Sequence, residues 1–170
     1  MVPFAGFEMP VQYEGLVAEH LAVRSGVGLF DVSHMGEIRV RGAKAAATLQ
    51  HLLTNAVLRV EDGQAQYNLM CNEKGGVVDD TVIYKIAADD FLVCANAANR
   101  DKDFAWIVEH NPHDDVSITD EGDAWAQIAV QGPKGPELTA SLTDSPVLDL
   151  ARYRFLPGRF AGIDGCLIAR

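Results

Sequence analysis

The sequence lacks the features that mark several large classes of protein. Its three cysteines, Cys71, Cys94 and Cys166, form no CxxC pair and have no histidine at metal-ligand spacing. We therefore expect buried, reduced thiols and no metal site. No apolar run approaches the roughly 20 residues that cross a bilayer, and the first residues lack the basic start and apolar core of a secretion signal. These absences favour a cytoplasmic protein, or one of the mitochondrial matrix in a eukaryote.

Positive charge is also scarce. The 170 residues carry a formal net charge of −10 and contain no run of Lys and Arg. A nucleic-acid surface needs such a basic patch, so the composition argues against a nucleic-acid partner. Glycine-rich phosphate loops, zinc-binding HExxH and the GxSxG of serine hydrolases are absent as well. The chain is nevertheless 48% hydrophobic, which suffices for one large core or two small ones.

The hydrophobic pattern predicts an α+β protein with largely antiparallel sheets and flanking helices, because helices and strands do not alternate strictly along the chain. Residues 4–13 and 27–36 show no clean periodicity, and we expect them to be irregular. Periods of 3.6 and 2 residues elsewhere predict helices and strands. The expected helices are 13–25, 43–53, 99–108 and 137–142, and the expected strands are 37–40, 64–71, 77–84, 91–96, 116–119 and 124–131, with a hairpin in 160–170 whose second strand is 166–170.

A strand with two carboxylates follows the glycine pair at positions 75 and 76. Because strand side chains alternate between faces, Asp80 shares a face with Val78, Val82 and Tyr84. That face is expected to be the buried, apolar one. Asp79 lies on the opposite face, where we expect a solvated or capping residue. A carboxylate on an apolar face needs hydrogen-bond partners, so Asp80 has either a structural or a chemical role.

The preceding strand gives a register for this hairpin. If the turn lies at Lys74-Gly75, Cys71 faces Val78, Leu69 faces Asp80 and Tyr67 faces Val82, which matches apolar face to apolar face. In this register Tyr67 lies diagonal to Asp80 on the same face.

A second polar group lies in the irregular segment 27–36. Asp31, Ser33 and His34 are the residue types of a catalytic triad, but triad members usually come from separate elements. Capping or turn roles for Asp31 and Ser33 are the better interpretation.

Several longer runs resemble one known family. The segments FAGFEMP (4–10), GLFDVSHMGE (28–37), GQAQY (63–67), NEKGGVVDD (72–80), NAAN (96–99) and QGP (131–133) are similar, in order, to the aminomethyltransferase of the glycine cleavage system, its T-protein. Small departures are Phe7, where the family usually has Trp, and Ala56, where it usually has Asp after Thr-Asn. The resemblance covers the whole chain.

The resemblance implies a domain organisation. Residues 37–122 are expected to form a ferredoxin-like α/β domain, and residues 1–36 and 123–170 an incomplete, discontinuous first domain. The family is about twice as long and has a third domain that this chain lacks. We therefore expect an N-terminal fragment that is inactive alone.

The resemblance also implies a reaction and a site. Family members transfer the methylene of an aminomethyl group from the lipoyl arm of the carrier H-protein to tetrahydrofolate, and ammonia is released. The family's catalytic Asp corresponds to Asp80. Family positions that line the folate site correspond to Met35, Tyr67, Val82, Tyr84 and Asn96. Tetrahydrofolate is a co-substrate, and no metal is implied.

Three alternatives remain open. The folate domain of flavin-dependent dimethylglycine or sarcosine oxidoreductases shares this fold and its catalytic Asp. A non-catalytic folate-binding branch assists iron–sulfur assembly, but it does not keep the Asp-Asp pair present here at positions 79 and 80. The chain by itself is also compatible with a folate-free interaction module.

Overall fold

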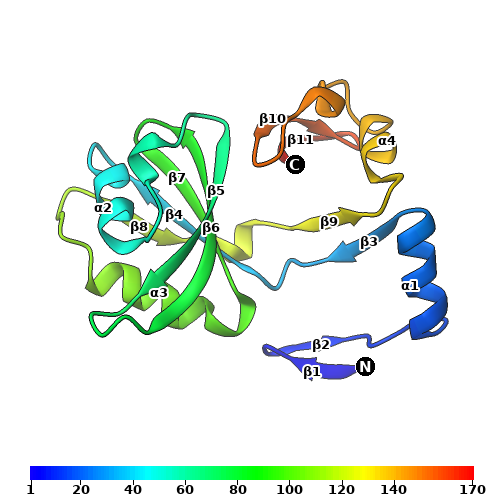
Figure 1. The fold of residues 1–170 in the computed structure, drawn as a ribbon, viewed down its shortest axis with the longest axis horizontal. Helices are drawn as coiled ribbons and strands as arrows, with labels where there is room; N and C mark the ends of the chain where they lie inside the picture. The colour runs from blue at the N-terminus through cyan, green and yellow to red at the C-terminus, as the bar shows by residue number, and fades with distance from the viewer. The chain divides into compact units, whose positions relative to one another are not determined.

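A computed structural model describes all 170 residues (Figure 1). The chain divides into two compact units. One unit contains Met35–Trp125, and the other combines Met1–His34 with Ala126–Arg170. The elements are helices and antiparallel strand pairs, which confirms the α+β class. None of the helices has the length and apolar character that crossing a membrane demands.

The unit Met35–Trp125 contains one five-stranded antiparallel sheet with the order β5-β6-β7-β4-β8. Along the chain, the elements follow the order strand, helix, strands, helix, strand. Across the sheet, β8-β4-β7-β6 have the strand order of a ferredoxin-like fold, and β5 is an additional strand at the edge. The elements are β4 (Gly36–Arg41), α2 (Ala45–Leu52), β5 (Gln64–Cys71), β6 (Val77–Ala87), β7 (Asp90–Ala95), α3 (Arg100–Glu109) and β8 (Ser117–Asp120), with 3-10 turns at Val57–Arg59, Ala97–Asn99 and Gly122–Ala124.

The core of this unit lies between the helices and one face of the sheet. From the helices, Leu49 of α2 and Ile107 of α3 are essentially fully buried. From the strands, the same cluster takes alternate residues such as Ile38, Ile83 and Val93. An apolar stripe at helical spacing on α2 therefore meets apolar residues at strand spacing, and this burial supplies the main driving force for folding the unit.

The register predicted for the β5–β6 hairpin is confirmed at two positions, because Leu69 pairs with Asp80 and Tyr67 pairs with Val82. The third prediction is wrong: Cys71 pairs with Val77 and not with Val78, since the ladder contains an irregularity after Met70. Gly75 in the turn has a φ of 79°, which glycine adopts without strain.

The prediction of which face of β6 is buried is also wrong. Asp79, Thr81 and Ile83 are the buried residues, whereas Asp80 and Val82 are only half-buried. Asp79 is therefore not solvated. Both faces of this strand carry valine or isoleucine, so alternation gives the two sets but does not say which set the helices cover.

The other unit contains three two-stranded ladders and two helices. Its elements are β1 (Val2–Phe4), β2 (Phe7–Met9), α1 (Leu16–Ser25), β3 (Gly28–Asp31), β9 (Ile128–Gln131), α4 (Gly135–Ala140), a 3-10 turn at Val147–Asp149, β10 (Phe155–Phe160) and β11 (Ile163–Ala169). Helix α1 has no buried residue, and large apolar side chains along it, such as Leu16 and Val17, are exposed.

Three predictions for this unit need correction. The segment 4–13 contains β2 and the end of β1, and 27–36 contains β3, so neither is wholly irregular. The last hairpin starts earlier than expected, with strands at Phe155–Phe160 and Ile163–Ala169. The β1–β2 hairpin turns on the Ala-Gly pair 5–6, and the β10–β11 hairpin turns on the Ala-Gly pair 161–162. All four residues have positive φ, as a two-residue hairpin turn requires. The strand β3 pairs only with β9, about a hundred residues later, so no local pattern identifies it.

Strand β9 is also shorter than predicted. It covers only the last four residues of the expected strand 124–131, since Ala124 belongs to the 3-10 turn Gly122–Ala124 and residues 125–127 are irregular. The cysteines differ from expectation as well, since all three are free but half-buried and not buried.

Candidate functional site

The site residues predicted from the sequence lie together in the unit Met35–Trp125. Asp80 and Val82 lie on β6, and Tyr67 on β5 faces Val82 directly. Val82 in turn faces Cys94 of β7. These side chains lie on the sheet face opposite the one that packs against α2 and α3, because they alternate with the core residues. They are half-buried or exposed, which leaves them open to a ligand.

Two side chains hold the carboxylate of Asp80. The hydroxyl of Tyr67 donates a hydrogen bond to Oδ2 at 3.1 Å, and the amide nitrogen of Asn96 lies 3.1 Å from Oδ1. The Asn96 amide also donates to the main-chain oxygen of Asp80 at 3.1 Å. An ionised carboxylate offers about four lone-pair positions. Two donors therefore fix the orientation of Asp80 and leave lone pairs for a substrate.

Asn96 reaches Asp80 because β7 ends one residue earlier, at Ala95. Its amide nitrogen additionally lies 3.0 Å from Oδ1 of Asp79, so one side chain contacts both carboxylates of the pair. Gly36 pairs with Ala95, which places Met35 and Asn96 at neighbouring ends of β4 and β7. The predicted residue Met35 thus lies at the same edge of the sheet as Asn96 and is half-buried.

Tyr84 lies two residues beyond Val82 on the same face and pairs with Ala65 and Leu92. Burial raises the pKa of its phenol to about 12, and the nearby Cys94 adds to this shift. The hydroxyl therefore stays protonated at neutral pH and remains a hydrogen-bond donor.

Sequence reasoning missed three buried carboxyl groups in this unit. The first is Asp79, which is 7% exposed, and the second is Asp103 of α3, which is 0% exposed. One signal for Asp103 was available: it lies four residues before the buried Ile107, on the inward face of the helix. The third is Glu37 of β4, which pairs with Cys94 and is 4% exposed.

Glu37 is a buried acid without a complete set of partners. Its Oε2 atom makes no hydrogen bond. Burial raises the pKa of Glu37 to about 7, because the positive charge of Arg100 lowers it less than burial raises it, and the negative charge of Asp120 raises it further. The folded chain consequently binds this proton more tightly than the unfolded chain does.

We expect this proton to make stability depend on pH. A carboxyl whose folded pKa is raised stabilises the folded state least when it is ionised, so Glu37 lowers the free energy of unfolding as the pH rises from about 4.5 to about 7. Glu37→Gln should remove up to about 3 kcal/mol of this decline. Urea unfolding at several pH values measures it. Glu73→Gln, in the exposed turn after β5, is the matched control. An unchanged decline in Glu37→Gln would contradict the role of Glu37.

The polar segment at the end of β3 forms a turn and not a triad. Oδ1 of Asp31 accepts a hydrogen bond from the main-chain nitrogen of Ser33 at 3.0 Å. The Ser33 hydroxyl accepts one from the nitrogen of Gln127, also at 3.0 Å. The ring of His34 packs edge-on against Phe4, with ring centres 5.6 Å apart. The structure thus favours the turn interpretation of Asp31 and Ser33.

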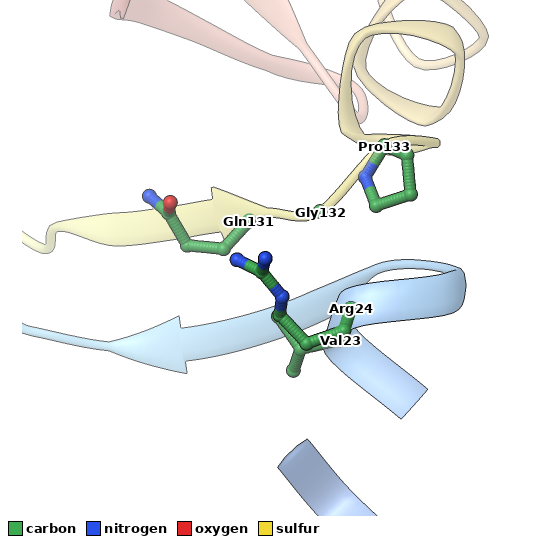
Figure 2. A pocket seen from close by; sticks show the side chains of 5 residues that line it. All are labelled: Val23, Arg24, Gln131, Gly132 and Pro133. Atoms are coloured by element: carbon green, nitrogen blue, oxygen red, sulfur yellow. The ribbon is translucent and has the colours of Figure 1, made fainter. Parts of the chain in front are cut away.

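A cavity of about 400 Å³ lies in the other unit, at the end of α1 (Figure 2). Figure 2 shows the guanidinium of Arg24 directed towards Gln131. Val23, Gly132 and Pro133 complete the lining. Gly132 has a φ of 121°, and a Cβ there would lie 2.5 Å from the oxygen of Gly26, so this loop requires glycine. The cavity contains none of the predicted site residues.

Together, the fold and the site define a ferredoxin-like α+β unit that presents an oriented carboxylate on the sheet face opposite α2 and α3. The whole chain, residues 1–170, matches the family described as the GCVT N-terminal domain. The chain therefore belongs to the GCVT N-terminal domain family.

Curated relatives agree with this assignment. The chain is 54% identical to the aminomethyltransferase of Bdellovibrio bacteriovorus over 95% of its length and 45% of that protein. It is 49% identical to the aminomethyltransferase of Chloroherpeton thalassium over the same shares. The chain thus spans about half the length of the curated relatives it matches.

Solved structures show the same fold. The glycine cleavage system aminomethyltransferase T of Bartonella henselae superposes with a TM-score of 0.82 at 31% identity, over 93% of this chain and 43% of that one. A heterotetrameric sarcosine oxidase from a Corynebacterium superposes with a TM-score of 0.63 over 91% of this chain and 76% of that one. Its identity of 13% shows a shared fold alone.

Proposed function

We propose that this chain provides the catalytic carboxylate and part of the folate site of an aminomethyltransferase of glycine cleavage. The reaction moves the methylene of an aminomethyl group from a lipoylated H-protein to tetrahydrofolate, releases ammonia and leaves the dihydrolipoyl thiol on the H-protein. The observation that carries this proposal is Asp80, whose carboxylate is oriented by Tyr67 and Asn96 on the sheet face opposite the helices. The aminomethyltransferases among the relatives support it.

The chemistry needs a carboxylate of this kind. The folate amine must lose a proton as it takes the methylene, and positive charge develops on the reacting carbon and nitrogen as ammonia departs. A positioned carboxylate orients the amine, accepts the proton and offsets the charge. Because its two donors are already fixed, the Asp80 carboxylate needs little rearrangement as the charge develops.

The remaining predicted residues are assigned to folate binding. The amide nitrogen of Asn96 donates to the carboxylates of Asp79 and Asp80. Its side-chain oxygen is therefore left to accept a hydrogen bond from the pterin edge. Val82 and Met35 offer apolar contact, and the ring of Tyr67, which is 46% exposed, packs beside the ligand. Tyr84 supplies a protonated hydroxyl.

We further assign the domain organisation, the protein partner and the cellular compartment. Residues 37–122 are the ferredoxin-like domain, and residues 1–36 and 123–170 belong to one discontinuous domain. A third domain lies in the part of the relatives that this chain does not span. The H-protein is the partner, and the compartment is the cytoplasm, or the mitochondrial matrix in a eukaryote.

The shared fold of the sarcosine oxidase favours one second candidate, a folate domain that accepts a one-carbon unit from an oxidase. The curated relatives, near 50% identity, favour the aminomethyltransferase instead. A non-catalytic folate binder is disfavoured because the chain keeps the Asp79-Asp80 pair.

The test is an assay of methylene transfer. We expect a chain of the relatives' length that contains these 170 residues to form methylene-tetrahydrofolate from the aminomethyl-loaded H-protein. The 170 residues alone should show no transfer and weak binding of tetrahydrofolate, because they span only about half of the relatives. Transfer from free formaldehyde but not from the loaded H-protein would favour the oxidase-type candidate. Tight binding by the 170 residues would contradict the expected dependence on the rest of the protein.

A further inference from the structure

The buried pair Asp79 and Asp103 lies directly behind Asp80 and takes no part in the proposed chemistry. Asp79 comes from β6, and Asp103 comes from the first turn of α3, which packs against that face of the sheet. The two residues are 7% and 0% exposed. Oδ2 of Asp79 and both carboxyl oxygens of Asp103 have no hydrogen-bond donor when both groups are carboxylates. Two buried carboxylates side by side are strongly unfavourable, because burial and mutual repulsion both disfavour the charged forms.

A single proton held between the two carboxyl groups removes one of the two buried charges and the repulsion between them. If Asp103 is protonated, its hydroxyl donates to Asp79, and the pair carries one negative charge. The charged groups that act on Asp103 are Asp79 across the interface and Lys102 on its own helix. Lys102 does not replace the proton. Its Nζ lies 3.6 Å from Oδ1 of Asp103, while it donates to the main-chain oxygen of Val78 at 2.5 Å.

The directions of the two pKa shifts agree with this arrangement. Burial, followed by the neighbouring Asp79, raises the pKa of Asp103 to about 7. Burial also tends to raise the pKa of Asp79, but hydrogen bonds from Asp103 and Asn96 outweigh it, so the pKa of Asp79 is lowered. The proton therefore belongs to Asp103, and Asp79 remains the carboxylate that accepts hydrogen bonds.

The pair is connected to the proposed catalytic residue through Asn96. The Asn96 amide nitrogen lies 3.0 Å from Oδ1 of Asp79 and 3.1 Å from Oδ1 of Asp80. We propose that Asp79 and Asp103 share one proton and act as a positioning pair, which holds the Asn96 amide in the orientation that fixes the carboxylate of Asp80. The catalytic meaning of this positioning rests on the proposed function, whereas the shared proton does not.

The shared proton is tested by NMR on the 170-residue chain. We expect the Asp103 carboxyl carbon to titrate near pH 7 and the Asn96 side-chain amide to shift with the same midpoint. In Asp79→Asn, an amide faces Asp103 in place of a carboxylate, so the Asp103 midpoint should move to lower pH. A wild-type midpoint near its ordinary value of 3.8, or one that Asp79→Asn leaves unchanged, overturns the proposal.

The positioning role is tested with two substitutions at Asp103. Asp103→Asn keeps a donor towards Asp79 at every pH, and Asp103→Leu keeps the number of side-chain heavy atoms but removes the donor. In methylene transfer by a chain of the relatives' length, we expect Asp103→Leu to lower kcat by about 10-fold or more. Asp103→Asn should restore most of this loss. The ratio of the Asp103→Asn rate to the wild-type rate should rise as the pH passes 7, because only the wild type loses its donor there.

Asp101→Asn is the matched control, since it removes an exposed carboxylate from the same helical turn. Equal losses in Asp103→Asn and Asp103→Leu, or a rate ratio that does not change with pH, overturn the positioning role. If Asp103→Leu fails to fold, the pH dependence of the rate ratio between Asp103→Asn and the wild type still decides whether the pair has the positioning role. If the wild type shows no transfer at all, the proposed function fails, and the NMR titration still decides whether the proton is shared.

Discussion

Asp80→Asn is expected to lower methylene transfer by about 10²–10⁴-fold in a chain of the relatives' length, the range found for loss of a positioned acid or base. Asparagine has the shape of aspartate and offers an oxygen to Asn96, but it carries no charge and does not accept a proton. The hydrogen bonds from Tyr67 and Asn96 at 3.1 Å have counterparts in the variant, so the fold should be retained. Steady-state rates with the aminomethyl-loaded H-protein measure the effect.

Asp89→Asn is the matched control for this substitution. Asp89 lies in the exposed turn between β6 and β7, and its replacement removes the same charge outside the site. We expect wild-type rates from it. Near-normal turnover in Asp80→Asn would show that the carboxylate is not the group that does the chemistry, even if the assay confirmed the overall reaction.

Asn96→Leu is expected to have the second-largest effect. Leucine has the same number of side-chain heavy atoms as asparagine but removes the donor towards Asp79, the Asp80 carboxylate and the Asp80 main-chain oxygen. A hydrogen bond to a charged group contributes about 1.5–3 kcal/mol, so we expect transfer to fall by roughly 10- to 100-fold. The free energy of unfolding should fall by about 1–3 kcal/mol, because a buried acceptor loses its donor. Rates and urea unfolding give the two quantities.

A double-mutant cycle separates positioning from general damage. If Asn96 acts on the chemical step by orienting the Asp80 carboxylate, Asn96→Leu should lower kcat little further once Asp80 is already Asn, and the loss of its folate contact should appear in KM. A full additional loss of kcat in the Asp80→Asn background would mean that Asn96 does not act through the Asp80 carboxylate.

The sequence predicted much of the hairpin that carries the site. The register that pairs Leu69 with Asp80 follows from matching apolar residues across a two-stranded ladder, and the structure confirms it. The helices α2 and α3 follow from their composition and spacing, although the structure ends them a residue or two from the predicted limits. Local patterns were sufficient because these elements are formed by neighbours in sequence.

The buried carboxyls could not be assigned in the same way. The alternation on β6 separates Asp79 from Asp80, but each set contains apolar residues, so the pattern is compatible with either face in the core. The prediction chose the wrong face. Glu37 has no sequence signal of burial, and Asp103 has only its spacing of four residues from Ile107 on the inward face of α3.

The sequence by itself determined the class of fold, the strand pairing of the hairpin and the family motifs that single out Asp80. The tertiary structure alone decided that Asp79 is buried beneath α3 and that one amide, that of Asn96, contacts both carboxylates. It also decided that β3 pairs with β9 across the length of the chain. The physical reason is the same in each case. Burial and long-range pairing depend on which distant segments come together, and a local pattern of apolar and polar residues carries no such information.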